Sequence, residues 1–503
     1  MAITGRAAPT QTLQRLSNKS LSALAPNVGR PAYDRSTVSP GIVHLGLGAF
    51  CRGHLAVYTD DVLASGVHNW GIIGVDLMSP AICEALKPQD CLYSVFSRQA
   101  GGDQLRIVGS LLDALAIPEQ LDRALAYMAA PQTRIVTLTV TEKGYCQDSA
   151  TGDLDETNKA IVADLANPSA PRTVPGLLSE AIRLRRAAGV APFTVLACDN
   201  LSQNGATARR VVIRFAELRD KELGNYIAEN ISFPCTMVDR ITPATLDEDR
   251  SAIAAEFGVE DAWPVVCEPF RQWVIEDHFP LGRPKWEDAG ALLVDDVHPF
   301  ELMKLRCLNG AHSTLSYLSV VAGIETIAEA MADPRLSALI HRLWAEDLVP
   351  TLPPVPGTDV SLYTKALEER FLNPGVRHRT LQISSDGSKK LPPRLLEPAL
   401  ARLQAGARPR NIALAVAAWM RFVVGVNEHG IAYEIADPLA TRLRKIGQDC
   451  GQNAERMAAE LFGVTEIFSP ELIAFDSFRR DVERSLNSLL TKGVHQTLTD
   501  FLA

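Results

Sequence analysis

The stretch GIVHLGLGAFCRG, residues 41–53, decides the fold of the N-terminal half of the chain. It opens with GIVHL, an apolar run of the length of a buried strand, and Gly46 and Gly48 follow directly. A glycine pair between a strand and a helix lets the backbone approach a pyrophosphate, which then lies at the positive end of the helix. Because Cys51 replaces the third glycine of the dinucleotide fingerprint, the turn alone is a weak signal.

Further apolar runs of strand length occur at residues 70–76, 134–141 and 193–200. Amphipathic stretches over residues 118–128 and 174–188 are long enough for crossover helices between such strands. This alternation predicts an α/β domain built on a parallel sheet.

The run at residues 70–76 ends in Asp76, 28 residues after Gly48. An acidic side chain at this place accepts hydrogen bonds from the adenosine ribose and repels a 2′-phosphate, which favours NAD over NADP. The cofactor-binding residues expected on this basis are Gly46, Gly48, Ala49, Phe50 and Asp76. The same residues also fit a simple tight turn followed by a solvated strand end.

After about residue 295 the strand-like runs fade and helical periodicity dominates, over residues 301–330, 334–348, 399–403 and 411–424. The sequence therefore predicts an α/β domain over residues 1–295 and a mainly helical domain over residues 296–503. Two proline-rich stretches, 350–359 and 390–398, are expected to be stiff loops inside the second domain.

The most chemically suggestive segment is PFELMKLRCLNGAH, residues 299–312. On a helix that advances ~100° per residue, its polar residues Glu301, Lys304, Asn309 and His312 fall within an arc of roughly 140°. Polar side chains among leucines on a buried face are costly to desolvate unless something uses them. An alternative is a purely structural network in which Lys304 pairs with Glu301.

Oxidation of a secondary alcohol by NAD⁺ requires a base for the hydroxyl proton and donors that stabilise the developing oxyanion. Lys304 is the expected base, since desolvation lowers the pKa of a lysine. Asn309 and Asn200, the latter at the end of the run 193–200, are expected to donate to the oxygen. His312 is expected to hydrogen-bond a neighbouring hydroxyl.

Composition excludes several other classes of protein. The 50 basic against 59 acidic residues give a net charge of −9, which argues against nucleic acid or an anionic membrane as partner. No CxxC, HxH, HExxH, GxSxG or GxxxxGK[ST] pattern occurs, so nothing indicates a zinc site, a serine nucleophile or a P-loop. We expect no metal.

The nine cysteines are scattered singly along the chain, so we expect reduced thiols and a cytoplasmic location. Residues 1–20 contain no apolar stretch, so we expect no secretory signal. The most apolar segment, residues 412–426, contains Arg421 and is shorter than the ~20 residues of a membrane span. It is expected to be a buried helix.

Eight motifs carry a resemblance to a known family: GIVHLGLGAFCRGHLAVYTDDVL, TVTEKGYC, FTVLACDN, FPCTMVDRITP, EPFRQWVIEDHF, GRPKWE, MKLRCLNGAHS and DGSKKLP. In this order they resemble the polyol-specific long-chain dehydrogenases, the family of mannitol 2-dehydrogenase and fructuronate reductase (D-mannonate oxidoreductase). The resemblance extends from about residue 20 to about residue 500.

The resemblance implies a zinc-independent, NAD-dependent enzyme with an N-terminal Rossmann-type dinucleotide-binding domain, a mainly α-helical C-terminal domain and an active site between them. It implies a monomer or small homo-oligomer that acts on a sugar alcohol or sugar acid. Lys304 matches the family's general base, Asn309 and Asn200 share the oxyanion role, and Glu301 exchanges protons with solvent. His312 belongs to the same motif. Asp239 and Lys390 match residues that face the substrate.

The sequence departs from the family pattern at the cofactor turn and in a segment that bears on the choice of substrate. The usual GAFHRAHQ is GAFCRGHL here, so Cys51, Gly53 and Leu55 alter the cofactor turn. Mannitol-oxidising members carry an arginine where this chain has Gln382, and the segment RHRTLQISSDGSKKLPPRLLEP is more similar to fructuronate reductases.

A uronate carboxylate needs a fixed cation, and Arg271, Arg306 and Arg379 are the candidates, although each is also a plausible salt-bridge partner. We therefore expect D-mannonate/D-fructuronate as the substrate pair. D-mannitol/D-fructose, or another hexitol or pentitol, is the second expectation. A non-catalytic dinucleotide or sugar sensor is disfavoured, because a sensor needs no base.

Overall fold

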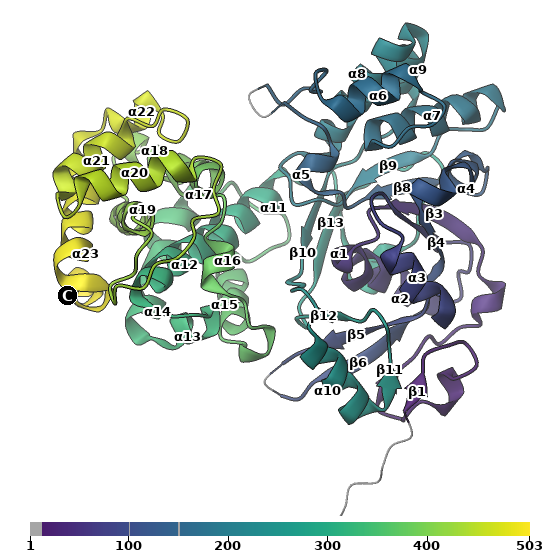
Figure 1. Cartoon of the computed structure of the whole chain (residues 1–503), viewed down its shortest axis with the longest axis horizontal. Helices are drawn as coiled ribbons and strands as arrows, with labels where there is room; N and C mark the ends of the chain where they lie inside the picture. The colour runs from purple at the N-terminus through teal and green to yellow at the C-terminus, as the bar shows by residue number, and fades with distance from the viewer. Residues whose placement is uncertain (1–12, 100, 149–150) are drawn as a thin grey trace, which may run out of the picture. The chain divides into compact units, whose positions relative to one another are not determined.

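The computed structural model describes residues 13–99, 101–148 and 151–503 (Figure 1). The chain divides into two compact units, Met1–Val297 and His298–Ala503, and each is described by itself. Most of the N-terminal segment from which we expect no secretory signal, residues 1–12, lies outside the described residues.

The first unit is built on a five-stranded parallel sheet with the order β7-β4-β3-β8-β9. Its strands are β3 (Pro40–Leu45), β4 (Gly71–Asp76), β7 (Leu111–Ala116), β8 (Ile135–Leu138) and β9 (Thr194–Ala197). The four strands predicted from apolar runs, β3, β4, β8 and β9, are confirmed. β3 is the first strand of this sheet along the chain and lies in its middle. The later strands are added on both sides of it, as in a dinucleotide-binding fold.

Alternate residues of these strands face opposite cores. On β3, Ile42 packs with α1 (Ala49–Gly53) and α2 (Leu55–Ala64), whereas Val43 packs on the other side. The helices of that second side include α4 (Ile117–Ala129), α7 (Val174–Ala187) and α8 (Asn204–Arg219) (Figure 1). The two crossover helices predicted over residues 118–128 and 174–188 are confirmed as α4 and α7.

Three smaller sheets accompany the main one in the described residues, and the sequence pattern did not predict them. One has the order β12-β5-β6-β2 and another the order β10-β13-β14, while β1 (Gln14–Arg15) pairs with β11 (Val259–Glu260). Their strands are β2 (Val28–Gly29), β5 (Tyr93–Ser97), β6 (Gln104–Val108), β10 (Thr236–Asp239), β12 (Val265–Cys267), β13 (Gln272–Glu276) and β14 (Leu292–Val294). These strands are two to five residues long and carry too little periodicity to be recognised in isolation.

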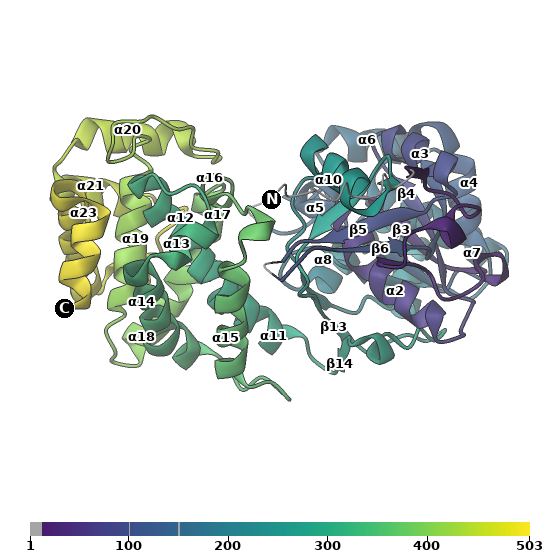
Figure 2. The same cartoon turned by 90° about the horizontal axis from the view of Figure 1, so that it is seen from below.

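The second unit is helical, and α19 (Arg410–Phe422) lies between α12 (Ala311–Ala322) and α23 (Asp476–Leu502) (Figure 2). Every residue of α12 is buried, and so is every residue of α19 after Arg410. The expectation that residues 412–426 include a buried helix is thereby confirmed. None of the helices in the described ranges is long and apolar enough to cross a membrane.

The proline-rich stretch 390–398 is not a loop, so that prediction is wrong. The chain is helical there, through α17 (Gly387–Leu391), the π-helical turn η9 (Pro392–Leu396) and α18 (Glu397–Gln404). The amide of Glu397 donates to the carbonyl of Pro392, five residues back. The wider turn accommodates prolines, which lack an amide hydrogen.

Candidate active site

The turn after β3 is possible only because residue 46 is glycine. Gly46 has φ +93°, and a Cβ there would lie 2.1 Å from the carbonyl oxygen of Thr139. Its amide donates to the carbonyl of Val75 at 2.8 Å, which ties the turn to the neighbouring strand. Gly48 is the N-cap of α1, and a Cβ there would meet nothing closer than the Gly46 carbonyl at 3.8 Å. The backbone at Gly48 is therefore open to a ligand.

His44 supports this turn from within the sheet, and sequence reasoning missed it. Its Nε2 lies 3.0 Å from the carbonyl oxygen of Gly46 and 2.9 Å from Oγ1 of Thr139, and its Nδ1 lies 2.7 Å from Oγ1 of Thr137. Burial lowers the pKa of His44 to about 4, so the ring is neutral at physiological pH. Nothing in a strand-like run signals this contact, because the threonines belong to another strand.

A cavity of about 350 Å³ opens beside the turn. Asp76 lines it, and its Oδ1 accepts the amides of Met78 and Ser79, both at 2.8 Å. Within the described part of the chain Oδ2 has no hydrogen-bond partner, so it is available to a ribose hydroxyl. The cavity wall consists of Leu47, Gly48, Ala49, Arg52, Asp76, Ser79, Ala81, Ile82, Thr245, Arg250, Trp263 and Pro264. These residues fit the adenosine half and pyrophosphate of a dinucleotide.

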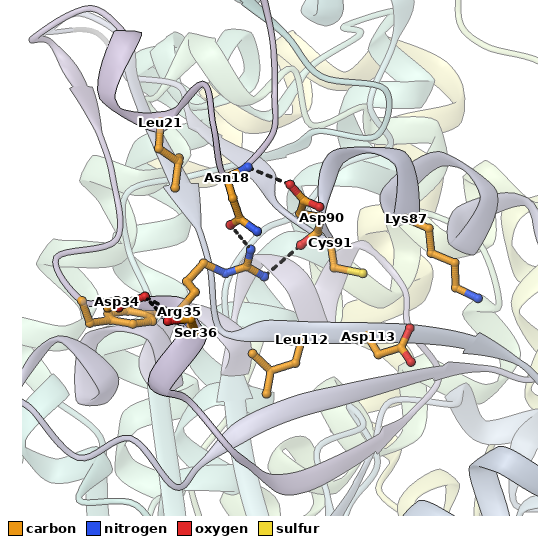
Figure 3. A pocket seen from close by; sticks show the side chains of 11 residues that line it. Asn18, Leu21, Asp34, Arg35, Ser36, Lys87, Asp90, Cys91, Leu112 and Asp113 are labelled. Carbon is orange, nitrogen blue, oxygen red and sulfur yellow. Dashed lines mark hydrogen bonds between the residues drawn. The ribbon is translucent and has the colours of Figure 1, made fainter.

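A larger cavity of about 600 Å³ in the same unit has a different character (Figure 3). Its central cation, Arg35, donates to the carbonyls of Asp90, Gly109 and Leu111. The guanidinium is occupied by these hydrogen bonds, which connect separate backbone segments. We therefore assign no ligand to this cavity.

Two of the predicted residues lie at or just after the carboxyl ends of strands of the first unit. Asn200 is exposed just after β9, and Asp239 is the buried last residue of β10. Between β9 and Asn200, the buried carboxylate of Asp199 accepts the amides of Val140 at 3.1 Å and Thr141 at 2.7 Å. Sequence reasoning missed Asp199, which binds the carboxyl ends of β8 and β9 together.

In the second unit, Lys304 and Asn309 lie in a π-helical segment, η5 (Lys304–Gly310). The helical-wheel prediction assumed an uninterrupted α-helix and is wrong on that point, because a π-helix turns less per residue. The indole of Trp344 donates to the carbonyl of Cys307 at 2.8 Å, inside the wide turn. Lys304 is 7% exposed. Short π-helical segments are frequent at functional sites.

The remaining residues of the motif lie on either side of η5. Glu301 is on α11 (His298–Met303), with its side chain 11% exposed and its Oε2 3.9 Å from Nδ1 of His298. His312 is on α12 and 4% exposed, and its ring stacks on that of Phe371 with centroids 4.4 Å apart. Its Nε2 has no hydrogen-bond partner in the described chain.

The predicted substrate-facing cations of this unit differ in their surroundings. Lys390, on α17, donates from Nζ to Oγ of Ser385 at 3.0 Å. Arg306 donates to the carbonyl of Thr351 at 2.5 Å. Arg379 is exposed and immediately precedes α16 (Thr380–Ile383).

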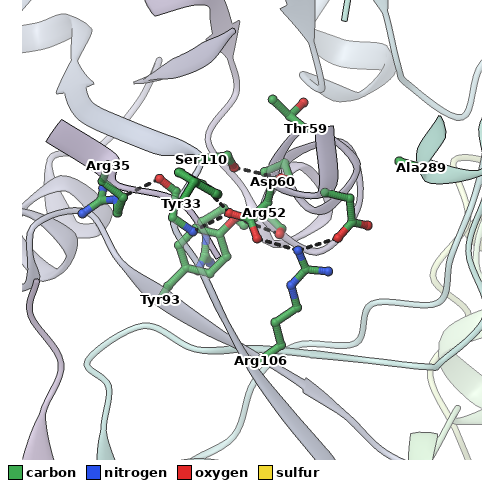
Figure 4. A network of polar contacts seen from close by, with 12 residues as sticks. Tyr33, Arg35, Arg52, Thr59, Asp60, Tyr93, Arg106, Ser110 and Ala289 are labelled. Atoms are coloured by element: carbon green, nitrogen blue, oxygen red, sulfur yellow. Dashed lines mark hydrogen bonds and ion pairs between the residues drawn. The ribbon is translucent and has the colours of Figure 1, made fainter. Parts of the chain in front are cut away.

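Arg271, in the first unit, belongs to a chain of ion pairs that ends at the pair of Arg106 with Asp60 drawn in Figure 4. It contacts Asp61 at 2.7 Å, and its guanidinium lies 4.2 Å from the ring centroid of Tyr58. Asp61 also contacts Arg106, which in turn pairs with the buried Asp60 at 2.5 Å. The charge of Arg271 is therefore balanced inside its own unit.

No group of three or more histidine, cysteine, aspartate or glutamate side chains in the described ranges is arranged to hold a metal ion. The glycine turn, the acidic strand end and the parallel sheet together define a protein of the dinucleotide-binding class.

Comparison with known proteins identifies the family. Residues 40–288 match the mannitol dehydrogenase Rossmann domain, and residues 296–490 match the mannitol dehydrogenase C-terminal domain. The chain belongs to the mannitol dehydrogenase family. It is an oxidoreductase that acts on the CH–OH group of a polyol or aldonate.

Three relatives illustrate the range of the family. The chain is 46% identical to the D-mannonate oxidoreductase of Escherichia coli, over 93% of this chain and 97% of that protein. It is 40% identical to the mannitol 2-dehydrogenase of Cereibacter sphaeroides, over 95% and 99% of the two chains. The structure of Pseudomonas fluorescens mannitol 2-dehydrogenase in a ternary complex with NAD and D-mannitol matches with a TM-score of 0.87 and 38% identity, covering 97% and 99%.

Substitution of Gly46 tests the turn. Gly46→Ala places a methyl group against the Thr139 carbonyl, whereas Gly66→Ala has nearly the same φ, +98°, and meets no atom within 4 Å. Urea unfolding should show a loss of about 1–2 kcal/mol for Gly66→Ala, from the left-handed backbone alone. Gly46→Ala should lose ~3 kcal/mol or more and should also weaken NAD⁺ binding. Equal losses would contradict the steric role of Thr139.

Proposed function

We propose that this protein oxidises D-mannonate to D-fructuronate with NAD⁺ and catalyses the reverse reduction. The observation that carries the proposal is the 46% identity, over 93% of the chain, to a D-mannonate oxidoreductase. The presence of Gln382, where the mannitol-oxidising pattern has an arginine, supports the same choice. Oxidation of D-mannitol to D-fructose is the second candidate, favoured by the 40% identity to a mannitol 2-dehydrogenase.

We propose NAD as the cofactor, bound by Gly46, Gly48, Ala49, Phe50 and Asp76. The open backbone at Gly48, at the N-terminus of α1, suits the pyrophosphate, and Oδ2 of Asp76 suits a ribose hydroxyl. When bound, NAD⁺ supplies the hydride acceptor. The carboxylate of Asp76 disfavours the 2′-phosphate of NADP⁺ by charge repulsion.

In the proposed mechanism, the buried Lys304 removes the proton of the reacting hydroxyl. The amides of Asn200 and Asn309 donate to the oxygen as negative charge develops on it. Glu301, whose side chain keeps 11% exposure, passes the proton from Lys304 to solvent. His312 holds a neighbouring hydroxyl.

Positioning of the substrate is assigned to the other predicted residues. We place Asp239 and Lys390 against the hydroxyl groups, and Arg306 and Arg379 near the carboxylate. Arg271 is the weakest of the three arginine candidates, because Asp61 already balances its charge.

A panel of substrates tests the proposal directly. Purified enzyme is assayed with NAD⁺ and D-mannonate, D-mannitol, D-sorbitol or D-arabinitol, and NADH formation is followed by absorbance. We expect kcat/KM to be highest for D-mannonate. A preference for a polyol by ~10-fold or more, equivalent to about 1.4 kcal/mol of transition-state binding, would instead establish the second candidate.

Lys304→Ala tests the assignment of the base. We expect kcat to fall by at least ~10² while NAD⁺ binding, followed by protein fluorescence, is unchanged. The matched control is Lys389→Ala, which removes an exposed lysine of α17. Undiminished turnover in Lys304→Ala would refute the role of Lys304 as the base.

The pH dependence of the wild-type enzyme tests the same role. The oxidation rate should rise with pH as Lys304 loses its proton, and a flat profile would refute the assignment. If the wild-type protein binds NAD⁺ but oxidises none of the substrates, a non-catalytic sensor is favoured.

Asp76→Asn tests the choice between NAD and NADP. Asparagine keeps an oxygen for the amides of Met78 and Ser79 but removes the charge. Because the repulsion of the 2′-phosphate is lost, the ratio of kcat/KM for NADP⁺ to that for NAD⁺ should rise about tenfold or more. Asp90→Asn, a residue of the larger cavity, is the control and should leave the ratio unchanged. A wild-type preference for NADP⁺ would overturn the role of Asp76.

A further inference from the structure

Two histidines of the second unit face one another, the buried His312 and the half-buried His378. The ring of His378, which precedes α16, lies with its centroid 5.0 Å from that of His312 and nearly perpendicular to it, at 88°. Nε2 of His312 and Nδ1 of His378 are both inaccessible to solvent and have no hydrogen-bond partner in the described chain. Buried polar atoms are almost always paired, so two unpaired nitrogens in adjacent rings indicate a place for ligand atoms.

The backbone holds His378 firmly in this position. The carbonyl of His378 accepts the amide of Ile327 at 3.0 Å, and the amide of Thr380 donates to the carbonyl of Glu325 at 2.9 Å. Arg377, the residue before it, adopts a left-handed conformation with φ +33°. Such a conformation is unfavourable for an arginine and persists where surrounding contacts enforce it.

Guanidinium groups act electrostatically on both rings. Burial together with the guanidinium of Arg370 lowers the pKa of His378 to about 4. Burial, His378, Arg370 and Arg394 hold the pKa of His312 well below its usual value. Arg394 is fixed beside the catalytic motif, since it donates to Oγ of Ser313 at 3.1 Å. Both imidazoles are therefore neutral hydrogen-bond donors or acceptors near guanidinium groups.

We propose that His378 is a substrate-binding residue that determines specificity by donating a hydrogen bond from Nδ1 to the carboxylate of a sugar acid. His312, whose ring adjoins it, contacts a hydroxyl of the same substrate. This inference rests on the proposed function, and it adds a neutral donor to the arginines already placed near the carboxylate. A neutral ring binds an anion without the desolvation of a second buried charge.

The test compares His378→Leu, which removes the donor, with His378→Asn, whose amide occupies nearly the position of Nδ1. His341→Leu, on the helix α14 (Pro334–Arg342), is the matched control, because His341 has a side chain that is 49% exposed. kcat and KM are measured for D-mannonate and D-mannitol, and binding of D-mannonate is measured by calorimetry in the presence of NADH.

We expect His378→Leu to lower kcat/KM for D-mannonate by about 10- to 100-fold, mainly through KM, as the loss of a hydrogen bond to a charged group does. The value for D-mannitol should change by less than about threefold, since a hydroxyl at this end makes a weaker hydrogen bond. His378→Asn should recover most of the loss, and His341→Leu should behave as wild type.

Other outcomes overturn the inference. If kcat/KM for D-mannonate is unchanged in His378→Leu, His378 does not bind the substrate. If both variants lose kcat/KM equally for D-mannonate and D-mannitol, His378 has a structural role only. If the wild-type enzyme oxidises neither substrate, the proposed function fails, and calorimetry decides the inference alone. A loss of D-mannonate affinity of about tenfold in His378→Leu upholds it, and the absence of binding to wild type overturns it.

Discussion

The dinucleotide site depends on the contact between the left-handed backbone of Gly46 and the carbonyl of Thr139. This contact brings the end of β3 against the end of β8, and His44 fixes it by bonding to both sides of the turn. A side chain at position 46 has no room, and α1 begins three residues later, with Gly48 as its N-cap and no side-chain cap. The cofactor turn is thus a property of two strands rather than of one loop.

The sequence was sufficient to predict those parts of the fold whose signals are local. Apolar runs predicted β3, β4, β8 and β9, because a parallel strand buried on both faces is apolar along its whole length. The π-helical segments at Lys304–Gly310 and Pro392–Leu396 were beyond this reasoning. The width of a helical turn depends on tertiary contacts, such as the Trp344 indole on the Cys307 carbonyl.

The same distinction applies to the candidate site. Lys304, Asn309 and His312 stand in one contiguous motif, so spacing and resemblance were enough to single them out. The roles of His44, Asp199 and His378 could not be predicted in this way. Each role depends on contacts with residues that are remote in the sequence. For His378 the decisive observation is a buried nitrogen without a partner, which no pattern of residues encodes.

A neutral imidazole and an arginine solve the problem of anion recognition differently. An arginine keeps its charge when the substrate is absent, and Asp61 balances that of Arg271. The ring of His378, with a pKa of about 4, carries no charge to balance and stays available as a donor. A bound carboxylate raises the pKa of that ring, since an opposite charge favours the protonated form. Binding of a sugar acid is thereby coupled to the protonation equilibrium of the ring.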